Sequence, residues 1–125
     1  MATEFGVIFA TLKAVLQRRA KSLDVQADSA EVYSLVGRVP SPFPQHKSNP
    51  MWFGSVRMGK TYVSFHLMPL YMNPPLEKQI PPELKKRMQG KSCFNFKTAP
   101  APEMLSQLDT LIANALDDWT AKGWL

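Results

Sequence analysis

Residues 51–68 read MWFGSVRMGKTYVSFHLM, and this stretch decides the fold. It contains two β-prone runs, 51–58 and 60–68, which meet at Gly59 and Lys60. A glycine at the first position of a two-residue loop is typical of a type II′ turn. The stretch therefore predicts two antiparallel strands joined by a tight hairpin.

The second run also indicates which way its side chains point. Every second residue in its centre is a large apolar one, namely Val63, Phe65 and Leu67. Because side chains alternate across a sheet, these three are expected to face the core and their neighbours to lie on the opposite face.

Amphipathic helices are predicted at both ends of the chain. Within residues 3–21, and again within residues 102–122, apolar residues recur with three- and four-residue spacing, which places them on one side of a helix. Thr3 is expected to cap the first helix. Its last turn is expected to hold three cations that complement the helix dipole, Arg18, Arg19 and Lys21.

The rest of the chain predicts shorter elements. Residues 23–26 and 31–36 are β-prone and suit a second hairpin, whereas the proline-rich residues 37–50 suit a long loop that sustains neither a helix nor a central strand. Proline pairs before Leu76 and Glu83 are each expected to start a short helix, the second ending at Gly90. Residues 92–97 predict a last strand.

These elements predict one α+β domain over residues 1–125. The order is α-β-β-β-β-α-β-α, without the alternating βαβ units of a parallel sheet. We therefore expect an antiparallel sheet of about five strands packed against N- and C-terminal amphipathic helices. A chain of this length commonly forms a single core.

Composition narrows the class of protein. The formal net charge of +5 is modest, and the basic residues fall into separate groups, so no specific nucleic acid binding is expected. No apolar run is long enough to cross a bilayer, and the first basic residues follow the first apolar stretch, unlike in a signal peptide. One cysteine fits a reducing compartment, so we expect a cytoplasmic protein. No cofactor or metal is expected, and the oligomeric state stays open.

The candidate site lies on the predicted outer face of the sheet and on the nearby basic segment. There the strands bring hydroxyl, imidazole, amide and thiol groups beside cations, a mixture that suits a small ligand with an anionic group. An ordinary half-exposed sheet face is the alternative. The candidate ligand-binding residues are Tyr62, Ser64, His66, Arg87, Lys91 and Cys93.

Two of these residues also allow chemistry. Cys93 lies between Lys91 and Lys97, cations that would lower its thiol pKa, and His66 on a neighbouring strand is its candidate base. The alternatives are a small buried hydrophobe at Cys93 and a hydrogen-bonded structural role for His66. The cations Arg87 and Lys91 equally suit a solvated helix end. No catalytic residue is assigned.

Two stretches resemble a known family: GKTYVSFHLMPLYMNPPL (residues 59–76) and IPPELKKRMQGKSCFNFK (residues 80–97). They are similar to the YdhG-like family, small bacterial α+β domains mostly of unknown function. The resemblance implies an antiparallel sheet with flanking helices. Some relatives in this family resemble frataxin-type iron chaperones, so the resemblance also suggests iron handling. Such proteins rely on clustered carboxylates, whereas the ten acidic residues of this chain are dispersed, which argues against that role.

The sequence as a whole favours a non-enzymatic binding or interaction module for a small anionic ligand or a protein partner. An iron-chaperone-like protein and a thiol-dependent enzyme using Cys93 and His66 are the alternatives.

Overall fold

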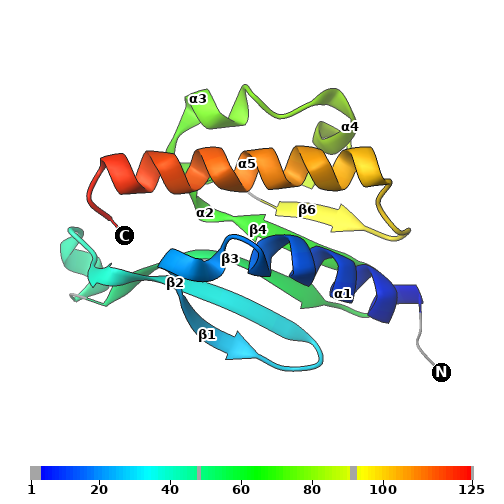
Figure 1. The fold of residues 1–125 in the computed structure, drawn as a ribbon, viewed down its shortest axis with the longest axis horizontal. Coiled ribbons are helices and arrows are strands. Elements are labelled where there is room, and N and C mark those ends of the chain that lie inside the picture. The colour runs from blue at the N-terminus through cyan, green and yellow to red at the C-terminus, as the bar shows by residue number, and fades with distance from the viewer. Residues whose placement is uncertain (1–3, 48, 91–92, 125) are drawn as a thin grey trace.

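Within residues 4–47, 49–90 and 93–124, which the computed structural model describes, six strands form one antiparallel sheet (Figure 1). Its order is β1-β2-β3-β4-β6-β5. The strands are β1 (Asp24–Asp28), β2 (Val32–Pro40), β3 (Pro50–Met58), β4 (Val63–Leu67), β5 (Met88–Gln89) and β6 (Cys93–Phe96).

Two long helices cover one face of this sheet. Helix α1 (Glu4–Gln17) packs on β3 and β4, and α5 (Pro102–Ala121) lies beside α1, as Figure 1 shows in blue and orange. Beneath them Val63, Phe65 and Leu67 are fully buried, as the alternation in the sequence predicts. The predicted α+β fold, with its antiparallel sheet and terminal helices, is confirmed.

The segment between β4 and β6 differs from the prediction in two ways. Met68, expected in a strand, begins a short helix α2 (Met68–Met72), because Pro69 cannot donate to a strand ladder but suits a first helical turn. Helices α3 (Pro74–Glu77) and α4 (Pro82–Lys85) begin at prolines as expected. However, α4 ends before Gly90, because the chain leaves the helix to pair with β6 as β5.

The hairpin between β3 and β4 is confirmed, but its two-residue turn is wrong. The ladder ends at the pair Met58 and Val63, so residues 59–62 form the connection. The amide of Gly59 donates to the carbonyl of Tyr62 at 2.9 Å, and Gly59 lacks the positive φ that a type II′ turn demands.

The predicted proline-rich loop is shorter than expected. Strand β2 continues to Pro40 and β3 begins at Pro50, where the two strands meet again after an irregular register. Between them lies a 3₁₀ turn, η2 (Pro44–His46). Pro40 and Pro50 are tolerated because they stand at strand ends, while Pro42 and Pro44 lie between the two strands.

The first helix is also shorter than predicted, and its capping residue Thr3 lies outside the described residues. Because α1 ends at Gln17, the basic residues from Arg18 onward follow its last turn. A short 3₁₀ helix, η1 (Ala20–Ser22), comes next. Arg19 instead donates two hydrogen bonds to Asp109 of α5, at 3.0 and 2.9 Å. This hydrogen-bonded guanidinium lowers the pKa of the Asp109 carboxyl and ties the two long helices together.

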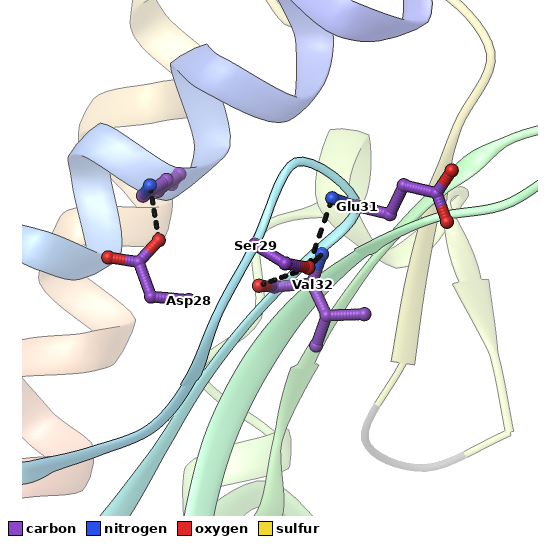
Figure 2. A network of polar contacts seen from close by, with 5 residues as sticks. Asp28, Ser29, Glu31 and Val32 are labelled. Atoms are coloured by element: carbon purple, nitrogen blue, oxygen red, sulfur yellow. Dashed lines mark hydrogen bonds and ion pairs between the residues drawn. The ribbon is translucent and has the colours of Figure 1, made fainter.

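The turn between β1 and β2 is closed by a backbone hydrogen bond from the amide of Ser29 to the carbonyl of Val32, at 2.8 Å, and by the Ser29 side chain (Figure 2). The hydroxyl of Ser29 accepts hydrogen bonds from the amides of Glu31 and Val32, at 3.3 and 3.2 Å. Beside it, Lys13 of α1 forms an ion pair with Asp28 at 2.7 Å. The edge hairpin is thereby anchored to the helix layer.

Candidate functional site

A row of small and polar side chains crosses the sheet on the face opposite α1 and α5. Ser34, Ser55, His66 and Cys93 are register partners on successive strands, and Gln89 on β5 continues the row. They share this face because they alternate with the core residues of their strands. We call this surface the open face; its serines Ser34 and Ser55 are themselves buried, whereas His66 and Cys93 are half-buried.

A β-bulge adds an aromatic ring to the open face. Leu35 pairs with Gly54, but the next residue, Val36, pairs with Trp52, so Phe53 is the extra residue of β3. The bulge reverses the alternation of side chains along β3. Phe53 is buried in the core, and Trp52 pairs with Val36, which follows the core residue Leu35 and therefore lies on the open face. The indole ring centroid of Trp52 lies 5.7 Å from that of the His66 imidazole.

His66 and Cys93 contact each other directly. They are cross-strand partners on β4 and β6, and Sγ of Cys93 lies 3.4 Å from Nε2 of His66. The same thiol donates to the side-chain oxygen of Asn95, also at 3.4 Å. The open face therefore holds a half-buried thiol between an imidazole and an amide.

Burial disfavours the charged form of both residues. Desolvation lowers the pKa of His66, and the nearby charge of Arg57 lowers it further. Desolvation raises the pKa of the Cys93 thiol. The sequence-based prediction that Lys91 and Lys97 give a lowered thiol pKa is therefore wrong in direction, because partial burial disfavours the thiolate. Lys97 is exposed, and Lys91 lies outside the described residues.

Labelling with a thiol reagent tests this conclusion. The labelling rate of folded protein should rise with pH along a curve shifted to higher pH than that of the same cysteine in urea-unfolded protein. The reason is that only the thiolate reacts, and a raised pKa delays its formation. A folded-state curve at lower pH than the unfolded control would instead reveal an activated nucleophile.

Tyr62 and Arg87 lie at a cavity next to the open face, where the β3–β4 connection meets strands β5 and β6. The cavity measures about 370 Å³, and we call it the basic hollow. Among the residues that the structure describes, three cations and no carboxylate line it: Thr61, Tyr62, Lys86, Arg87, Met88, Gln89, Asn95 and Lys97. The guanidinium carbon of Arg87 stands 5.7 Å from the ring centroid of Phe96, a stacking contact that limits its motion.

The structure thus divides the predicted site residues into two neighbouring groups. Tyr62 and Arg87 line the basic hollow, while Ser64, His66 and Cys93 lie on the open face. Asn95 joins the groups, since it contacts the Cys93 thiol and also lines the hollow.

A second cavity, of about 260 Å³, lies where β3 begins and β4 ends; we call it the aromatic hollow. The loop around η2 and helix α2 build most of it. Its lining residues are Phe43, Gln45, His46, Met51, Trp52, Met68, Tyr71 and Met72. Sequence reasoning missed this hollow, although the methionines and aromatic residues that flank the hairpin were a signal.

Two absences hold for the parts of the chain that the structure describes. There, no group of three or more histidine, cysteine, aspartate or glutamate residues is placed to hold a metal ion. Likewise, none of the described helices is both long and apolar enough to cross a membrane.

Comparison with known proteins found no match among family models, curated proteins or solved structures.

Proposed function

We propose that this chain is a non-enzymatic binding domain that takes a small anionic ligand in the basic hollow. The supporting observation is the lining of that hollow. Lys86, Arg87 and Lys97 surround it together with the hydroxyl-bearing Tyr62 and the amide of Asn95. Among the described residues that line it there is no acid, and Glu83 lies in a neighbouring cavity beside Lys86 and Arg87.

The hollow suits a phosphate or carboxylate group for two physical reasons. A cluster of cations in a concave surface focuses positive potential and attracts anions. A guanidinium can also donate two parallel hydrogen bonds to such a group, and Arg87 supplies one to the lining of the hollow. Because the site opens to solvent, added salt should weaken binding.

Titration calorimetry with inorganic phosphate tests the proposal. Wild-type protein should bind phosphate saturably, and the Arg87→Ala/Lys97→Ala variant should bind it at least about tenfold more weakly, since each lost hydrogen bond to a charged group costs roughly 1.5–3 kcal/mol. Thermal unfolding gives a second readout, because a hundredfold excess over Kd should add about 2.7 kcal/mol of stability.

A variant with the same loss of charge serves as the control. Lys21 and Lys78 are exposed and do not line the hollow. Lys21 belongs to η1, which packs against β1 and β2 at the opposite edge of the sheet. Lys21→Ala/Lys78→Ala should leave the affinity nearly unchanged. An equal loss of phosphate affinity in this control would show that the effect comes from net charge alone. Wild-type protein that binds no phosphate would refute the proposal.

A thiol-dependent enzyme is the second candidate, and the 3.4 Å contact between Cys93 and His66 supports it. The raised thiol pKa argues against it, and the labelling experiment decides between them. Two further alternatives are an iron-chaperone-like role and binding of a protein partner, and neither is supported by a particular contact. Anaerobic calorimetry with ferrous ion tests the iron-chaperone-like role. Membership of the YdhG-like family is likewise proposed on the resembling stretches.

A further inference from the structure

The two hollows are connected by an unbroken series of side-chain contacts along the open face. Trp52, which lines the aromatic hollow, packs its ring 5.7 Å from that of His66. His66 contacts Cys93, and Cys93 contacts Asn95, each at 3.4 Å. Asn95 lines the basic hollow. A ligand lying along this series would therefore touch both cavities.

The aromatic hollow differs in chemistry from the basic one. Methionine thioethers and three aromatic rings supply most of its lining, and among its described lining residues there is no lysine, arginine or carboxylate. Its imidazole, His46, has Nδ1 hydrogen-bonded to the hydroxyl of Ser41 at 2.6 Å. Flexible thioethers and flat rings adapt to apolar groups of varied shape. This cavity therefore suits the apolar part of a ligand.

We infer that the ligand is an amphiphilic anion, whose charged head binds in the basic hollow and whose apolar tail crosses the open face into the aromatic hollow. The inference rests on the proposed function and adds the chemical class of the ligand. The cations of the basic hollow favour a negatively charged head group. The series of contacts from Asn95 to Trp52 marks the path of the tail across the open face.

The spacing of the strands sets the length of the tail. From Trp52 on β3 to Asn95 on β6 is two steps across the sheet and several residues along it, on the order of 15–20 Å. Between the hollows the tail passes His66 and Cys93, which are polar and only half-buried, and gains little there. Affinity should therefore depend on tail length in two stages.

A series of linear alkyl phosphates tests this arrangement by calorimetry, with inorganic phosphate as the reference. Short tails should bind about as inorganic phosphate does. Once the tail is long enough to enter the aromatic hollow, each further methylene buried should improve the affinity about fourfold. Binding should saturate at one molecule per chain, below the concentration at which the alkyl phosphate aggregates.

A variant of the aromatic hollow provides the matched control. Tyr71 is 61% exposed, so Tyr71→Ser alone should leave the fold intact. Met72 packs partly buried against the core, so the fold of the double variant with Met72→Ser is checked by circular dichroism. Unchanged affinity for inorganic phosphate verifies that the fold is intact. The gain from long tails should disappear in the double variant, whereas a gain that persists there would overturn the inference.

The other outcomes separate the two proposals. If inorganic phosphate binds but long tails add nothing, the inference fails and the proposed function stands. If neither binds, both fail. If long-chain phosphates bind only as aggregates, the protein recognises a charged surface and the single-molecule inference is wrong.

Discussion

Trp119→Ala should lower the free energy of unfolding by about 3–5 kcal/mol, the range for truncating a large aromatic residue in a core. Trp119 is a fully buried side chain of α5. Its ring meets Phe53 edge-on at a centroid distance of 5.4 Å and Trp124 at 5.7 Å. Removing it leaves a cavity between the helix layer and the bulge of β3. Urea denaturation monitored by circular dichroism measures the change.

Trp119→Phe is the control for this substitution. It keeps an aromatic ring in the same place and removes an indole N–H that is buried without an acceptor among the described residues. Its cost should therefore be clearly smaller than that of alanine. Equal costs for the two variants, or a loss below about 1 kcal/mol for alanine, would contradict the packing described here.

Gly54→Ala should destabilise the fold by about 3 kcal/mol, at the upper end of the usual range for overpacking. Gly54 lies in β3 between β2 and β4, opposite Leu35 and Leu67. A Cβ atom there would stand 2.6 Å from the backbone carbonyl oxygen of His66. Backbone atoms in a central strand cannot move aside as a side-chain end can, so the strands must separate.

The same substitution should also disturb the candidate site, because the carbonyl that it displaces belongs to His66. Gly59→Ala is the control, since its Cβ would stand 3.1 Å from a backbone oxygen in an exposed connection. We expect that variant to lose far less stability in the same urea experiment. A Gly54→Ala protein as stable as the wild type would show that β3 and β4 are not packed this closely.

Most of the fold could be predicted because its elements depend on local periodicity. The apolar stripes of α1 and α5 and the alternation in β4 are written in residues a few positions apart. Element ends and turns were predicted less well. The predicted geometry of the β3–β4 turn was wrong. Strand β5 was predicted as the end of a helix, because its pairing with β6 depends on a turn and not on a repeating pattern of residues.

The candidate site was predicted only in part. Alternation alone placed Ser64 and His66 on one face, and the pairing of β4 with β6 brought Cys93 beside them. The sign of the thiol pKa shift came out reversed, because neighbouring charges can be seen in a sequence whereas burial cannot. The aromatic hollow escaped prediction because its residues come from the η2 loop, β3 and α2.

By itself, then, the amino-acid order determined the two amphipathic helices, the buried side of β4 and the polar character of its other side. Only the tertiary structure decided that a bulge at Phe53 turns Trp52 toward His66, and that Arg87 and Tyr62 meet at one cavity. The physical reason is range. Side-chain periodicity acts within one helix or strand, whereas register, burial and cavities arise where separate elements pack together.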